Sequence, residues 1–193
     1  MKRTTILLLC AVLGTAGVRP PPVFNDTFED DPLHVGVPRR YKVFGDEMRG
    51  GSITIDELGD GNHCAYVEID FEKDTWGGLV LCNAGDLKLR GTEISVRVRA
   101  AVDMQAMDGV VGFKLIDADG TEFRTAEKDL FSPGTTWQTF SQKARKLVPC
   151  DIKGENPKLD LGHITHYGIA FYDRGDYNEQ VTIFFDDFKA QKR

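Results

Sequence analysis

Two adjacent carboxylates, Asp186 and Asp187, lie inside an apolar run that extends from Val181 to Phe188. β-Branched and aromatic residues crowd this run without Gly or Pro, which predicts a buried β-strand. A carboxylate there is costly unless it is paired, hydrogen-bonded or bound to a metal, and strand alternation lets only one of the two point at a given site. A second acidic and aromatic stretch, 23–31, lies near the other end of the chain. We hypothesise that the two stretches meet and close a β-sandwich that can hold a cation.

A strand that begins at His166 and ends near Tyr172 offers a candidate ligand surface. Gly168 and Ala170 share one face of this strand with the two larger polar residues, and small residues between large ones leave room for a groove. Sugar-binding clefts combine aromatic rings with side chains that bond hydroxyl groups. The alternative is that Gly168 and Ala170 lie under a covering loop.

Three further candidates come from pattern alone. Arg97 and Arg99 share the polar face of a strand, where they can bind a ligand or simply be solvated. Trp76 is expected at a hairpin tip, where an exposed indole suits stacking against a sugar ring.

No enzyme motif is present: the sequence lacks Gly-x-Ser-x-Gly, His-Glu-x-x-His and a P-loop. Two catalytic arrangements stay open. One is a pair of carboxylates brought together from different strands. The other is a lyase pair in which His166 acts with Tyr167 or Tyr172.

The elements that must position these residues are short strands separated by turn signals, without long 3.6-residue periodicity. This pattern predicts an all-β fold, an antiparallel β-sandwich of the jelly-roll type. We expect a loop over 30–51 and three hairpins: 63–71 with 77–82, 110–116 with 121–125, and 166–173 with 181–189. The other strands are expected at 23–28, 52–58, 93–99 and 137–142.

The N-terminus has a basic start, an apolar stretch and small residues, and these predict a signal peptide over 1–17. A Pro-rich linker at 18–22 then leads to a single domain over 23–193, expected to be secreted or periplasmic. The 30 acidic against 24 basic residues disfavour nucleic acid as a partner, and no further apolar run would span a membrane. Cys64 and Cys82 are expected to face each other across the first hairpin, as a disulfide or as buried thiols.

Several short motifs follow one order along the chain: Asp-Thr-Phe-Glu at 26–29, Trp137, Leu-Gly-His-Ile-Thr at 161–165, Gly-Ile-Ala-Phe at 168–171, and Ile-Phe-Phe-Asp-Asp-Phe at 183–188. This order resembles that of the jelly-roll carbohydrate-binding modules, most closely family eleven, within the galactose-binding-like group. The resemblance covers nearly the whole mature chain.

The resemblance implies a non-catalytic protein that holds a polysaccharide, such as a β-glucan, on a concave sheet. It also implies a structural Ca²⁺ held by Glu29 and Asp186, with the loop at Asp60 supplying further oxygens. Carboxylate and carbonyl oxygens suit Ca²⁺, although Asp186 can instead cap amides or pair with a cation. The family pattern places Trp137 in the core. A separate glycan-degrading enzyme is a candidate partner.

Two alternatives remain. One is a jelly-roll polysaccharide lyase or glycoside hydrolase. The other is a galactose-binding-like interaction or assembly domain, because Gly45–Ser52 resembles the Met-Gly-Gly motif of a complex I intermediate-associated domain.

Overall fold

The computed structural model describes residues 22–28, 41–44, 54–57, 63–70, 76–150, 157–173 and 180–192, which form two six-stranded sheets. The first sheet has the order β3 (Thr54–Glu57), β4 (His63–Asp70), β12 (Gln180–Lys192), β6 (Thr92–Ala100) and β9 (Gln138–Lys143), with β1 (Phe24–Asp26) paired to β12. The second has the order β10 (Val148–Pro149), β8 (Glu122–Arg124), β7 (Gly109–Asp117), β11 (Ile164–Asp173), β5 (Trp76–Leu87) and β2 (Tyr41–Phe44). Three short 3₁₀ turns complete the described part: η2 (Met104–Met107), η3 (Glu127–Asp129) and η4 (Ala144–Lys146).

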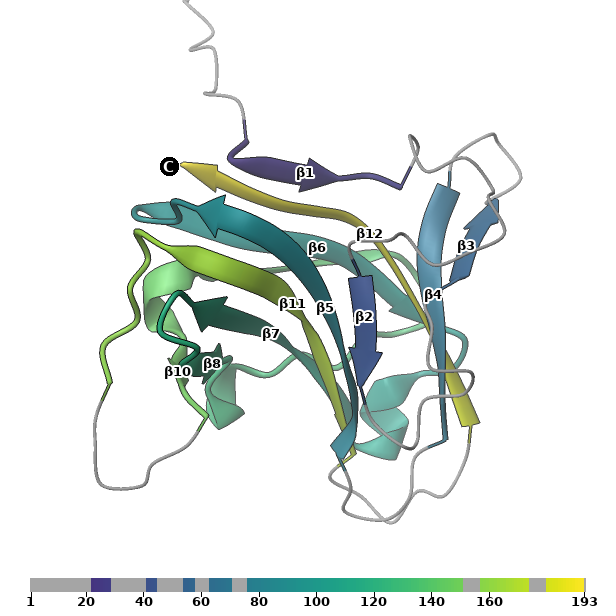
Figure 1. The fold of residues 1–193 in the computed structure, drawn as a ribbon. Helices are drawn as coiled ribbons and strands as arrows, with labels where there is room; N and C mark the ends of the chain where they lie inside the picture. Colours follow the sequence, from purple (N-terminus) through teal and green to yellow (C-terminus); the bar gives the residue numbers. More distant parts are fainter. Residues whose placement is uncertain are drawn as a thin grey trace, which may run out of the picture.

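The strand pairs are antiparallel in both sheets, and the sheets form the two layers of a sandwich (Figure 1). The predicted all-β, antiparallel sandwich is therefore confirmed. Alternation along β6 explains the layering: Ile94, Val96 and Val98 are fully buried, whereas the residues between them are half-buried on the outer face.

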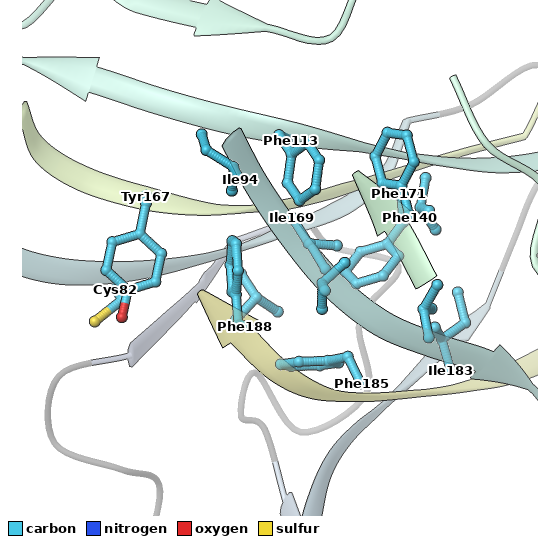
Figure 2. Packing of buried hydrophobic residues seen from close by; sticks show 14 of the residues in the cluster. Cys82, Ile94, Phe113, Phe140, Tyr167, Ile169, Phe171, Ile183, Phe185 and Phe188 are labelled. Atoms are coloured by element: carbon cyan, nitrogen blue, oxygen red, sulfur yellow. The ribbon is translucent and has the colours of Figure 1, made fainter. Parts of the chain in front are cut away.

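The core lies between the sheets and is filled by side chains from both. Figure 2 shows Tyr167, Ile169 and Phe171 of β11 in one cluster with Phe185 and Phe188 of β12. Their burial supplies the main favourable free energy of folding.

The predicted meeting of the two acidic stretches is confirmed. β1 pairs with β12 so that Phe24 lies opposite Ala190 and Asp26 opposite Phe188 (Figure 1). Asp26 is buried and accepts a hydrogen bond of 2.5 Å from the Tyr167 hydroxyl of β11. This bond ties the second sheet to the end of the first, and it satisfies a carboxylate that would otherwise be costly to bury.

The predicted hairpins of 63–71 with 77–82 and of 166–173 with 181–189 are wrong. In both cases the chain crosses from one sheet to the other instead of forming a hairpin. β4 and β12 lie in the first sheet, whereas β5 and β11 lie in the second. The predicted hairpin of β7 with β8 is confirmed. Cys64 of β4 and Cys82 of β5 consequently lie in different sheets and do not face each other across a hairpin.

The predicted loop over 30–51 contains the strand β2, which pairs with β5 and which the sequence reading missed. The predicted signal peptide, and all but Pro22 of the linker, lie outside the described residues. Within the described part, no helix is long and apolar enough to cross a membrane.

Candidate functional site

The outer face of the second sheet carries the strand on which His166 and Tyr172 were predicted to flank a groove. β11 lies between β5 and β7, and its register places His166 beside Asn83 and Ile116. The two predicted residues, both half-buried, do share this face with Gly168 and Ala170, because Tyr167, Ile169 and Phe171 point into the core.

The middle of this face is filled rather than hollow. Ala170 is only 2% exposed and Leu81 only 6%, and the two pack with Ile116 and Tyr172 as a small apolar cluster. Gly168 is buried as well. Gly168 and Ala170 were interpreted either as the floor of a groove or as residues covered by other groups. Their burial favours the second interpretation. Among the described residues, polar groups on this face lie at the two ends of β11 and on the neighbouring strands β7 and β8.

Hydrogen bonds orient the ring of His166. Thr165 Oγ1 lies 3.2 Å from the backbone carbonyl oxygens of both Ile116 and Asp117, and it donates its single hydrogen there. It therefore accepts from His166 Nδ1, which lies 3.0 Å away. This arrangement directs the Nδ1 proton to Thr165 and leaves Nε2 of a neutral imidazole as an acceptor for a ligand hydroxyl.

A charged cluster that the sequence reading missed lies on the same face, around Lys114. Its side chain is 10% exposed, forms an ion pair with Glu122 and donates to Cys150 Sγ at 3.0 Å. Burial alone would lower the pKa of Lys114, but hydrogen bonds to Cys150 and Glu122 outweigh it and raise the pKa above 10.5. For Tyr172, whose charged form is the deprotonated phenolate, burial raises the pKa above 10.0, and the positive charge of Arg124 opposes this rise.

These shifts predict a loss of stability in alkali. For both Lys114 and Tyr172 the folded state holds a proton that the unfolded state gives up at about pH 10, so the stabilising contribution is complete below that pH. It is lost as the pH rises through the raised pKa values. Urea unfolding between pH 8 and 11 should show stability falling above about pH 10. The fall should be smaller in Lys114→Met, and an unchanged profile in that variant would refute the role of Lys114.

Trp76 lies at the start of β5, where its backbone pairs with Tyr172. It is thus brought to the same sheet as His166 and Tyr172, while its side chain lies outside the described residues. Three of the five predicted ligand residues therefore come from neighbouring strands of the second sheet.

The other two, Arg97 and Arg99, lie on the outer face of the first sheet, in the opposite layer. Both guanidinium groups stack on Trp137, with centroid distances of 5.0 Å and 5.4 Å, and Arg99 also covers Phe184 at 3.9 Å. The expected core position of Trp137 is therefore wrong: the indole is half-buried beneath two arginines. Cation–π stacking explains this placement without a ligand.

Asp186 was predicted as a calcium ligand, and its side chain is 8% exposed. Arg97 Nη1 lies 3.3 Å from Asp186 Oδ2 and 3.7 Å from Asp187 Oδ2. Asp187 lies within a register irregularity between Asp186 and Lys189 and has φ +49°, and both carboxylates reach the same arginine. The expected alternation of the two acids therefore fails at this bulge, which re-aims a side chain.

The predicted calcium ligands Glu29 and Asp60 lie outside the described residues. In the part of the chain that is described, no group of three or more His, Cys, Asp or Glu side chains could hold a metal. Asp186 fits a calcium site as a buried carboxylate, but Arg97 already supplies it with positive charge. The calcium site stays a prediction.

The two histidine–tyrosine pairs considered for a lyase do not meet. Tyr167 is buried and donates to Asp26, away from the outer face that carries His166. His166 and Tyr172 are six residues apart on one strand, which separates them by about 20 Å. Neither pair can serve as acid and base on one bond.

Comparison with known proteins finds similar folds among solved structures. No family model and no curated protein matches the sequence. An exo-beta-agarase matches with a TM-score of 0.59 and 10% identity, over 87% of this chain and 24% of the agarase chain. The family 11 carbohydrate-binding module of a cellulosomal cellulase of Clostridium thermocellum matches with a TM-score of 0.55 and 13% identity, over 90% of this chain and 97% of that module.

Two further solved structures of carbohydrate-binding modules from Clostridium thermocellum have a similar fold. A family 30 carbohydrate-binding module matches with a TM-score of 0.53 and 16% identity, over 80% of this chain and 92% of that module. A family 11 module in complex with a β-1,3-1,4-mixed-linked tetrasaccharide matches with a TM-score of 0.55 and 12% identity, over 87% of this chain and 95% of that module. The chain spans about a quarter of the agarase and nearly all of the three modules. It therefore has the β-sandwich fold of carbohydrate-binding modules, with family eleven among its structural neighbours.

Proposed function

We propose that this chain is an exported, non-catalytic carbohydrate-binding protein that holds a β-glucan-like polysaccharide on the outer face of the second sheet. The observation that carries the proposal is the shared fold, which places the β5–β11–β7 sheet in a sandwich of the same type as modules that bind sugars. The motif order and the predicted signal peptide support the same reading.

The chemistry of the face fits this role at its two ends. His166 Nε2 can accept from a sugar hydroxyl. Asn83, its exposed neighbour on β5, provides a further polar group, and the exposed Glu122 lies beyond Ile116 on β8. Tyr172 presents a half-buried ring at the other end of β11, next to the backbone of Trp76. Aromatic faces and oriented polar groups are the two elements of sugar recognition.

We expect His166→Ala to lower the affinity for a soluble mixed-linkage β-glucan about tenfold, because one lost hydrogen bond costs about 1.4 kcal/mol. Isothermal titration calorimetry or retardation in polysaccharide-containing native gels would measure this. His163→Ala is the matched control, because His163 precedes the strand, is exposed, and its ring lies 3.2 Å from the exposed Asp86.

Equal losses in the two variants would argue against the second sheet as the binding surface. The absence of binding to β-glucan, xyloglucan and xylan would overturn the carbohydrate proposal itself. The same incubations would show new reducing ends if the protein were a hydrolase, which would refute the non-catalytic role.

The proposal includes a structural Ca²⁺ near the junction of β1 and β12, with Asp186 as one ligand. A ligand bound only by the native state stabilises it, so EDTA is expected to lower the melting temperature by about 5 °C or more. Asp186→Asn should remove this EDTA effect. If EDTA leaves the melting temperature of the unaltered protein unchanged, calcium is ruled out and Asp186 serves as an ion-pair partner of Arg97.

A further inference from the structure

The outer face of the first sheet carries a row of aromatic and cationic side chains that crosses the sheet from β4 to β9. Tyr66 of β4 lies opposite Phe184 of β12, and Phe184 lies opposite Arg99 of β6. These three half-buried residues point outward, because their neighbours along each strand are buried in the core. Trp137, immediately before β9, continues the row through its contact with Arg99.

Ring contacts join the members of this row. The rings of Tyr66 and Phe184 have centroids 5.8 Å apart. The Arg99 guanidinium carbon lies 3.9 Å from the Phe184 centroid and 5.4 Å from the Trp137 centroid. Neighbouring strands are about 4.8 Å apart, so the row spans about 14 Å. It is therefore longer than a single sugar ring.

Arg99 is the cation of this row, and no carboxylate of the described residues pairs with it. Arg97, two residues earlier on β6, pairs instead with Asp186 and Asp187. Stacking holds the Arg99 guanidinium in place, but it uses none of the N–H donors. A guanidinium that is already held in place loses little freedom when it binds an anion, so Arg99 is preorganised for a negatively charged ligand.

The surroundings of Arg99 favour a ligand that carries one carboxylate on a sugar ring. A guanidinium can bind both oxygens of a carboxylate through two parallel hydrogen bonds. The exposed Glu68 and the 30% exposed side chain of Asp187 lie on the same sheet and would repel further negative charge. Tyr66 and Trp137, at the two ends of the row, offer rings to the apolar faces of sugars.

We propose that the row of Tyr66, Phe184, Arg99 and Trp137 is a second glycan-binding surface that recognises a uronate unit, with Arg99 binding its carboxylate. The proposal rests on the proposed function only for the choice of a sugar as the ligand. The row and the surface around His166 belong to opposite sheets and share no residue. The protein would hold a neutral glycan on one sheet and a uronate-bearing glycan on the other.

The test is an NMR titration of the ¹⁵N-labelled full chain with methyl β-D-glucuronide and methyl α-D-galacturonide, and with the corresponding neutral glycosides. The neutral glycosides differ only at C6, where a hydroxymethyl group replaces the carboxylate. At least one glycuronide should shift the Trp137 indole N–H and the Arg99 Nε–H, saturating in the millimolar range, and should leave His166 unchanged. The neutral glycosides should bind at least about tenfold more weakly, because they lack the charge-assisted bonds to Arg99.

Arg99→Gln removes the charge and should weaken glycuronide binding at least about tenfold. Arg99→Lys keeps the charge without the planar fork, so it should recover part of the loss. Arg145→Gln is the matched control, because it removes the same charge from an exposed arginine of η4 outside the row, and it should leave the titration unchanged. Should Arg99→Gln fail to fold, the Arg99 Nε–H shift in the unaltered protein decides the question without a variant.

Three results would each overturn the proposal: no shift at Trp137 and Arg99 with either glycuronide, equal binding of the acidic and neutral glycosides, and equal losses in the Arg99 and Arg145 variants. Propionate, a carboxylate without a sugar ring, separates a sugar site from a general anion site. If propionate binds as tightly as the glycuronides, uronate recognition is refuted.

These outcomes are independent of the polysaccharide experiment. His166→Ala should weaken binding to β-glucan and leave the glycuronide shifts intact, whereas Arg99→Gln should do the reverse. If β-glucan does not bind but the glycuronides do, the proposal for the second sheet fails and the row on the first sheet stands. If only β-glucan binds, the row fails and the second sheet stands.

Discussion

Gly168→Ala is expected to destabilise the protein by about 3 kcal/mol, the upper end of the usual cost of overpacking. A Cβ added at Gly168 would lie 1.9 Å from the Val80 carbonyl oxygen and 3.0 Å from Leu81 Cα. Both are backbone atoms of β5, which pairs with β11 at this point. The strands would have to separate to admit the methyl group, so hydrogen bonds between them would be lost. Urea unfolding would measure the change.

The control for this substitution is Gly134→Ala, where the nearest atom to the new Cβ, Gln138 Oε1, is 3.7 Å away. That change should be neutral or slightly stabilising, because alanine restricts the unfolded chain. If the two variants have the same stability, β11 does not approach β5 as closely as described. The centre of the face between His166 and Tyr172 would then be open to a different interpretation.

Phe188→Ala is expected to cost about 4 kcal/mol, because it removes a fully buried ring and leaves a cavity. Phe188 is 1% exposed and meets the rings of Tyr167, Phe24 and Phe113 at centroid distances of 4.9 Å, 5.7 Å and 5.9 Å. Those partners come from β11, β1 and β7, so this one side chain joins both sheets (Figure 2 labels it with Tyr167 and Phe113). The loss should appear as a lower urea midpoint with an unchanged slope.

Val102→Ala serves as the comparison, since Val102 is 37% exposed and should change stability by less than about 0.5 kcal/mol. A loss below about 1 kcal/mol for Phe188→Ala would mean that the neighbouring rings collapse into the space, or that β1 does not cover β12 as described.

Local pattern determined much of the fold. Alternation in 93–99 correctly identified Ile94, Val96 and Val98 as core residues, because a strand with one buried face must repeat every two residues. The run around Phe185 and Phe188 correctly indicated a buried strand that meets the N-terminal stretch. The hairpin of 110–116 with 121–125 was predicted correctly and corresponds to β7 and β8. Each of these inferences depends on residues close together in the chain or on a strong apolar signal.

Long-range pairing was not available from the sequence. Two adjacent strands can form a hairpin or cross to the opposite sheet with the same alternation, and this is why 166–173 and 181–189 were wrongly paired. β2 was missed because its four residues lie among Pro and Gly signals that indicate a loop. The bulge at Asp187 also escaped prediction, since one left-handed residue breaks an alternation that the sequence alone presents as intact.

The candidate sites likewise combine features that the local sequence predicts with features that depend on long-range pairing. His166 and Tyr172 share a face because they are an even number of residues apart on one strand, and the sequence determined that much. Lys114 and Glu122 come together on that face through strand register. Arg99 meets Phe184 and Trp137 only because β12 and β9 lie on either side of β6. Along regular strands such as β6, the sequence by itself determined which residues are buried and which face they share, because those depend on local periodicity. Only the tertiary structure decided which faces belong to the same layer and which polar groups are left without partners, because both depend on contacts between distant segments.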